Sequence, residues 1–272
     1  MPLQSPTRIA AQFRDLRSKQ QKGLVVYLTA GDPNLDATGE LLLALDRAGV
    51  DVIELGVPFS DPLADGPVIQ RASERALRAG TTLCKILERF PSWRGATNAP
   101  IILFSYFNPI LQFGLERFAA TASTAGVDGA LVVDLTTDEA DDYVRAMRAK
   151  RLDTVFLASP TSTDARLEHA AQLSTGFLYL ISRTGVTGEG NEIASGVQLL
   201  VERARGFTAL PIAVGFGISS PAQVHEVQQH ADAAVVGSAV VHAIEEHYSS
   251  QGAAAIERFV RRLKNGTENQ LA

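Results

Sequence analysis

The amino-acid sequence predicts a single α/β domain, residues 1–272, folded as a (β/α)8 barrel of the TIM type. Short apolar runs alternate along the chain with amphipathic stretches of helical period, which is typical of a parallel sheet covered on its outer face by helices. A length of 272 residues suits one such barrel. The segment Ala-Gly-Val-Asp at 48–51 recurs at 125–128, which indicates a repeating βα unit.

Eight apolar runs have the length and composition of strands, the number that a closed barrel requires. We expect these strands at 24–30, 52–57, 101–107, 130–135, 154–159, 177–183, 212–217 and 233–237. An extra helix at 6–19 precedes the first strand. The other helices are expected at 36–48, 67–79, 83–90, 115–125, 138–150, 164–173, 195–204, 221–229 and 253–264, with a short one at 239–246.

A doubly wound open sheet is the competing architecture, and it normally carries G-x-G-x-x-G after its first strand. The turn here reads Thr29-Ala-Gly-Asp-Pro33, so the barrel is favoured. The uncharged span 95–115 is long enough to raise the question of a membrane helix. Two asparagines and two prolines interrupt it, so a buried strand, a loop and the start of a helix fit better.

Composition excludes several classes of function. The net charge is −5 and the basic residues are scattered, so there is no footprint for nucleic acid. Cys84 is the single cysteine, which indicates a reducing compartment without disulfides. Residues 1–23 lack the apolar region of a signal peptide. We therefore expect a cytoplasmic protein.

The most informative stretch of the chain is 54–67, Glu-Leu-Gly-Val-Pro-Phe-Ser-Asp-Pro-Leu-Ala-Asp-Gly-Pro. Glu54 lies inside an apolar strand, where burial raises the pKa of a carboxyl group. Asp61 and Asp65 follow in a loop stiffened by three prolines. Carboxyl groups at the carboxyl end of a barrel strand are placed for acid–base chemistry. The alternative is structural: Glu54 pairs with an arginine or caps a turn, and Asp-Pro starts a turn.

Glycine-rich turns follow the last three predicted strands, at 184–188, 215–219 and 237–239. Barrels often bind phosphate there, because glycine lets backbone N–H groups approach the oxygens and a helix N-terminus adds partial positive charge. We expect Ser238 to cap the short helix at 239–246. The alternative is that βα turns simply favour glycine. The long loop 183–194 has the composition of a lid, or of a disordered excursion.

Taken together, these segments resemble the α subunit of tryptophan synthase over nearly the whole length of the chain. The most specific matches are the stretch 54–67, Ser182-Arg-Thr-Gly-Val-Thr-Gly188 and Gly215-Phe-Gly-Ile-Ser219. The resemblance implies a (β/α)8 barrel that cleaves indole-3-glycerol phosphate to indole and glyceraldehyde 3-phosphate without a cofactor. It also implies a β subunit as partner, in an α2β2 tetramer that passes the indole onward.

The resemblance assigns roles to residues of this sequence. Glu54 matches the catalytic glutamate and Asp65 the second catalytic acid. The positions implied for substrate binding are Tyr106, Tyr179, Thr187, Gly188, Gly217, Gly237 and Ser238. Asp61, Asn108 and Asp134 are implied on the face that meets the β subunit. No metal ligand is implied.

One segment departs from the family pattern. The family usually carries Pro-Asp-Leu-Pro after the fourth strand, whereas this chain reads Val133-Asp-Leu-Thr-Thr137 and keeps only the aspartate and leucine. Coupling to a partner is therefore in question, and a stand-alone indole-3-glycerol-phosphate lyase stays an alternative. A non-catalytic regulatory barrel is a second alternative, against which both acids argue. A Schiff-base aldolase would need a lysine at a strand end, and the predicted strands contain no lysine.

Overall fold

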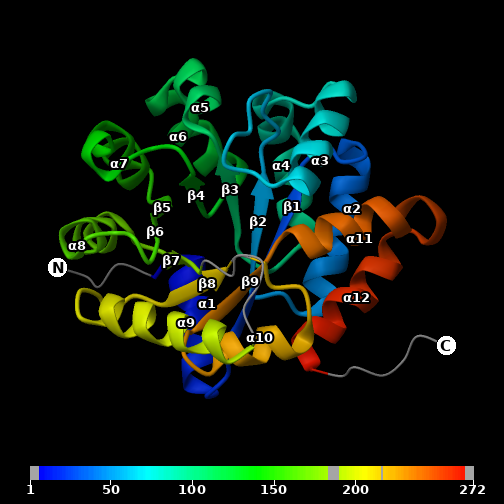
Figure 1. The fold of residues 1–272 in the computed structure, drawn as a ribbon. Coiled ribbons are helices and arrows are strands. Elements are labelled where there is room, and N and C mark those ends of the chain that lie inside the picture. The colour runs from blue at the N-terminus through cyan, green and yellow to red at the C-terminus, as the bar shows by residue number, and fades with distance from the viewer. Residues whose placement is uncertain (1–5, 183–189, 216, 267–272) are drawn as a thin grey trace.

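The computed structural model describes residues 6–182, 190–215 and 217–266, with the side chains of 190–195 left out. Within these ranges the strands form one parallel sheet in the order β5-β4-β3-β2-β1-β9-β8-β7-β6 (Figure 1). Their bounds are β1 (Gly23–Thr29), β2 (Val52–Gly56), β3 (Ile101–Ser105), β4 (Gly129–Val132), β5 (Asp153–Val155), β6 (Leu157–Ala158), β7 (Leu178–Ile181), β8 (Ile212–Gly215) and β9 (Ala233–Val236).

The two edge strands of this order, β5 and β6, are successive in the chain and are separated only by Phe156. The predicted fifth strand, 154–159, is thus two short strands, and the chain itself joins the two edges of the sheet. Side chains of the turn between α8 and β7 replace ladder bonds at this point. The Thr175 hydroxyl accepts from Thr154 N at 3.0 Å and the Ser174 hydroxyl from Phe156 N at 3.1 Å. The predicted eight-stranded barrel is confirmed, with one strand broken.

Helices surround the sheet on its outer side (Figure 1). Their bounds are α1 (Arg8–Ser18), α2 (Leu35–Ala48), α3 (Pro67–Arg78), α4 (Leu83–Ala96), α5 (Phe107–Phe113), α6 (Leu115–Ala125), the 3-10 helix η1 (Thr137–Glu139), α7 (Asp141–Ala149), α8 (Asp164–Leu173), α9 (Gly190–Arg205), α10 (Pro221–Gln228), α11 (Ser238–Gln251) and α12 (Ala253–Asn265). Several begin at Ser, Thr or Asn residues whose side chains accept from a first-turn N–H, as N-caps do: Thr7, Asn34, Thr82, Thr163 and Ser220.

Two expectations fail in this outer layer. The predicted strand 101–107 ends at Ser105, and helix α5 begins at Phe107, where the Asp134 carboxylate accepts from the Phe107 backbone N–H at 2.7 Å. The predicted helix 138–150 is divided into η1 and α7. In the first case a side chain from the next βα unit decides the boundary, and local periodicity does not contain that information.

Most of the buried apolar residues form two cores, one on each side of the strands, and a small third cluster joins Tyr27 to Ala72 of α3 and Val241 of α11. The outer core packs alternate strand residues against the helices. The inner core fills the barrel, and Ile9, Phe13 and Leu16 of α1 belong to it. The Phe13 ring lies 5.9 Å from that of Phe177. Helix α1 therefore closes the amino-terminal end of the barrel, and the carboxyl-terminal end is left for the site. Among the described residues, no helix is long and apolar enough to cross a membrane.

Candidate active site

A cavity of about 730 Å³ lies at the carboxyl-terminal ends of the strands. The predicted site residues among those that line it are Glu54, Asp65, Tyr179, Gly217, Gly237 and Ser238. Residues from both halves of the chain thus line one cavity, as expected for the catalytic face of a barrel. The predicted substrate-binding residues Thr187 and Gly188, with most of the predicted lid, lie outside the described residues.

Glu54 lies in the middle of β2 and is 1% exposed. Its Oε1 atom is buried and has no hydrogen-bond partner among the described residues, and none of the ion pairs there includes this side chain. Burial raises the pKa of Glu54 to about 8. The structural alternative, in which Glu54 pairs with an arginine, is therefore not observed. A carboxyl group with this pKa is available as an acid and as a base near neutral pH.

Asp65 lies in the loop before α3 and is held from two sides. The Tyr106 hydroxyl donates to its carboxylate at 3.2 Å and accepts from Ala64 N at 2.9 Å. The Gln70 amide of α3 donates to the Asp65 carbonyl oxygen at 2.9 Å. Burial raises the pKa of Asp65 to about 6, against the lowering effect of the Tyr106 hydrogen bond. Tyr106 was expected to bind the substrate, but it does not line the cavity. It lies behind Asp65 and donates a hydrogen bond to that carboxylate.

Gly217, Gly237 and the start of α11 also line the cavity. Gly217 has φ of 74°, a conformation that favours glycine. The expectation that Ser238 caps a short helix is wrong. Gly237 occupies the N-cap position without a side-chain hydrogen bond among the described residues, and α11 runs from Ser238 to Gln251. The first N–H groups of this uncapped helix can thus bind an anion.

Tyr27 of β1 is a cavity residue that the motifs did not indicate. It pairs in register with Glu54, so both side chains point into the barrel. Its ring meets that of Phe104 edge-on at 5.2 Å. Glycines make room for the tyrosine hydroxyls: a Cβ at Gly56 would lie 2.2 Å from the Tyr27 hydroxyl oxygen, and one at Gly215 would lie 2.4 Å from that of Tyr179. The position of Tyr27 beside Glu54 depends on the register between β1 and β2, so no pattern within either segment indicates it.

Charged groups lie on the rim of the cavity, on α3 and α11. Arg71, His242, Glu246 and His247 are among the lining residues, and the His242 side chain is 52% exposed. Among the described residues, no group of three or more His, Cys, Asp or Glu side chains is arranged to hold a metal ion.

The residues expected at a partner interface lie beside the cavity mouth. Asp61 and Asn108 are exposed, and Asp134 is exposed while it holds the start of α5. Two leucines on the same segments are also exposed, Leu63 at 92% and Leu111 at 50%. Singly exposed leucines are common on proteins, so these two support a partner surface only together with the polar residues implied there.

Fold and cavity together define a TIM-barrel protein of the enzyme class, with two carboxyl groups and an uncapped helix N-terminus lining one cavity. The family model described as tryptophan synthase alpha chain matches residues 13–268. The chain belongs to this family.

Individual relatives agree with the family match. The chain is 52% identical to the tryptophan synthase alpha chain of Solibacter usitatus, over 96% of this chain and 98% of that protein. It is 48% identical to that of Geotalea uraniireducens, over 96% and 98%. Among solved structures, subunit alpha of Legionella pneumophila tryptophan synthase superposes with a TM-score of 0.89, at 34% identity over 97% of this chain and 100% of that one. Tryptophan synthase of Mycobacterium tuberculosis in an aminoacrylate-bound form gives 0.86, at 33% identity over 96% and 99%.

Proposed function

We propose that the chain is a carbon–carbon lyase, the α subunit that cleaves indole-3-glycerol phosphate into indole and glyceraldehyde 3-phosphate for a tryptophan synthase β subunit. One observation carries this proposal: Glu54 and Asp65 line the same cavity as an uncapped helix N-terminus. A substrate with an aromatic group at one end and a phosphate at the other matches that arrangement.

In the proposed reaction, the Glu54 carboxyl group transfers its proton to C3 of the indole ring. The ring then carries a positive charge, which the Asp65 carboxylate stabilises by accepting a hydrogen bond from the ring N–H. The bond between C3 and the glycerol carbon breaks, and its electron pair returns to the ring. The Glu54 carboxylate takes the proton of the adjacent hydroxyl, which becomes the aldehyde. Glu54 ends the cycle protonated again, so no external acid or base is consumed.

The phosphate is assigned to the other end of the cavity. Backbone N–H groups at Gly217, Gly237 and Ser238 and the positive end of α11 would hold it. Tyr179 would line the path between the two ends. Thr187 and Gly188, in the proposed lid, would complete the enclosure as the resemblance implies.

The exposed surface beside the cavity supports the β subunit as partner. Leu63 and Leu111, with Asp61, Asn108 and Asp134, offer apolar and polar groups where the cavity opens. We extend the proposal to an α2β2 tetramer. A stand-alone lyase would have the same carboxyl groups but no use for this surface. A non-catalytic regulatory barrel would have no use for a buried Glu54 of raised pKa.

The test is release of indole from indole-3-glycerol phosphate, measured with and without a tryptophan synthase β subunit. Slow cleavage that rises by orders of magnitude with β would support the α-subunit function. Fast cleavage that is indifferent to β would indicate the stand-alone lyase. Absence of cleavage under both conditions would refute the lyase activity.

A further inference from the structure

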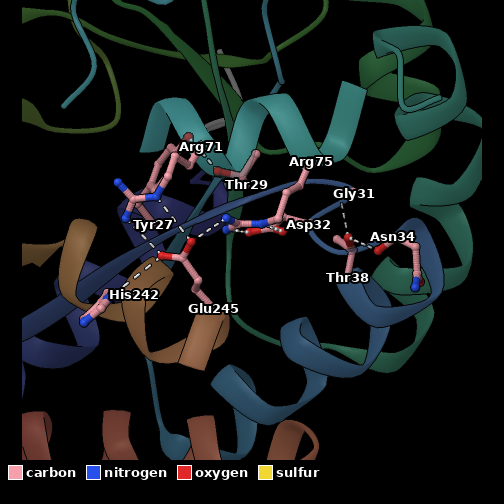
Figure 2. A network of polar contacts seen from close by, with 10 residues as sticks. All are labelled: Tyr27, Thr29, Gly31, Asp32, Asn34, Thr38, Arg71, Arg75, His242 and Glu245. Atoms are coloured by element: carbon pink, nitrogen blue, oxygen red, sulfur yellow. Dashed lines mark hydrogen bonds and ion pairs between the residues drawn. The ribbon is translucent and has the colours of Figure 1, made fainter. Parts of the chain in front are cut away.

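A chain of ion pairs connects α3 with α11 and with the loop after β1 (Figure 2). At its centre is Glu245 of α11, which accepts from two arginines of α3. Arg75 Nη1 lies 2.7 Å from Glu245 Oε1, and Arg71 Nη2 lies 3.1 Å from Glu245 Oε2. Arg75 also binds the Asp32 carboxylate through two hydrogen bonds of 2.8 Å. The Asp32 side chain is only 4% exposed.

The Asp32 end of this chain is fixed to the barrel. The hydroxyl of Thr38 accepts from the Gly31 backbone N–H at 2.8 Å and donates to the Asn34 carbonyl oxygen at 3.0 Å (Figure 2). Gly31 has φ of 83°, and a Cβ there would lie 1.9 Å from the Thr81 hydroxyl oxygen. The loop is therefore tightly packed, and Arg75 is anchored to a rigid point.

Helices α3 and α11 lead to different parts of the candidate site. Helix α3 follows directly after the Asp65 loop and holds that loop through Gln70, which is one residue before Arg71. Helix α11 begins at Ser238, where the phosphate is proposed, and Glu245 lies two turns later. Glu245 thus connects the helix behind the acid to the helix that would bind the phosphate.

We infer that Glu245 is a positioning residue that holds α3 against α11 and so sets the separation between Asp65 and the phosphate end of the site. This inference rests on the proposed function. The hydrogen bonds from Arg71, together with those of Arg75 and the charges of both arginines, lower the pKa of Glu245 to about 2. The connection is therefore ionised at every pH at which the enzyme would be assayed.

The test compares ligands that occupy both ends of the site with ligands that occupy one. Glu245→Gln removes the charge that holds both arginines while keeping the shape of the side chain. We expect kcat/KM for indole-3-glycerol phosphate to fall about 10-fold or more, because a small misplacement of binding groups is costly for a substrate that must meet both. The dissociation constants of inorganic phosphate and of indole, each measured alone on the full chain, should change less than about 2-fold, since each end stays intact.

Glu257→Gln is the matched control. Glu257 of α12 also lies between two arginines, with Arg47 Nε at 2.9 Å and Arg261 Nη2 at 2.8 Å, but these contacts are outside the cavity. It should match Glu245→Gln in any loss of Tm while leaving kcat/KM unchanged. Arg71→Gln, which removes only one of the two links, serves as a milder variant if Glu245→Gln does not fold.

Two results would overturn the inference. One is a kcat/KM of Glu245→Gln within about 2-fold of wild type. The other is a loss of affinity for inorganic phosphate or indole alone that equals the loss of kcat/KM for indole-3-glycerol phosphate. Failure of the wild-type chain to cleave the substrate would instead refute the proposed function. The two failures are thus distinguished by the wild-type assay.

Discussion

At the scale of single residues, the unusual feature is an acid whose protonation is governed by burial alone. Glu54 has neither a salt-bridge partner nor a hydrogen bond for Oε1 among the described residues, and burial raises its pKa to about 8. A purely structural carboxylate would be expected to have a partner, because burying an unpaired ionised group is costly. The absence of a partner favours a role in proton transfer.

Glu54→Gln should reduce indole release by about 10²–10⁴ or more, because the amide can neither donate an acidic proton nor accept one. The variant should still bind inorganic phosphate.

The stability of Glu54→Gln relative to wild type should depend on pH, since the folded protein holds the Glu54 proton more tightly than the unfolded chain does. Wild type therefore loses stability as the pH rises from 4.5, the ordinary pKa of a glutamate, to about 8, and the glutamine variant does not. Calorimetry at pH 5 and pH 9 should show the variant gaining in Tm relative to wild type at the higher pH. An unchanged turnover number would remove Glu54 from the mechanism.

The pH dependence of kcat/KM should follow both acids. The proposed first step needs ionised Asp65 and protonated Glu54, so activity should rise through about 6 and fall through about 8. Asp65→Asn should lower turnover severely, by about 10² or more, with substrate binding retained. In this variant, the acid limb of the pH profile of kcat/KM should no longer reflect the titration of Asp65. The titration of the substrate phosphate would still appear in the profiles of both proteins. An identical acid limb in wild type and variant would assign that limb to the substrate.

At the scale of elements, α1 has a structural role that is separate from the site. Phe13 is 5% exposed and packs against Phe177 inside the amino-terminal end of the barrel. Phe13→Ala should lower the free energy of unfolding by about 3–5 kcal/mol, the usual cost of removing a buried phenylalanine. Arg14→Ala, an exposed position of the same helix, should cost less than about 0.5 kcal/mol. Urea denaturation measures both. Folded Phe13→Ala should keep its kcat, and loss of kcat without loss of stability would contradict this separation.

The elements also show where local pattern is insufficient. Helix α5 begins at Phe107, inside a predicted strand, because Asp134 accepts from the Phe107 backbone N–H. The fifth strand is broken at Phe156, because hydroxyl groups of Ser174 and Thr175 bond to the backbone there. Both causes are side chains at least 18 residues away in the sequence.

At the scale of the whole molecule, the exposed leucines predict a partner surface. Leu111→Gln on α5 should weaken binding to a tryptophan synthase β subunit about 10-fold, since burying a leucine side chain contributes about 1.5–3 kcal/mol. Cleavage by the isolated chain should not change. Leu199→Gln is the control, because Leu199 is 63% exposed on α9, on a different side of the barrel (Figure 1). Titration calorimetry with the β subunit measures the difference. Equal affinities for the two variants would place the interface elsewhere.

The sequence by itself determined the architecture and predicted two acids that the structure places in one cavity. Apolar periodicity and glycine-rich turns are properties of short segments, so they could be read without knowing what packs where. They predicted Glu54 near the end of a strand, whereas it lies in the middle of β2, and Asp65 in the loop after that strand. The rule for barrels then predicted both on one face. Family resemblance added the roles of these residues and the substrate.

Only the tertiary structure decided which side chains meet across the barrel. It placed Tyr27 beside Glu54 through strand register, and the Tyr106 hydroxyl against Asp65. It also joined Arg75 to Glu245, 170 residues further along the chain. Such contacts depend on the register of strands and the packing of helices that are distant in sequence, and no periodicity within one segment encodes them. The physical reason is that burial and ion pairing are properties of a surface formed by several elements together, whereas strand and helix formation is dominated by near neighbours in the chain.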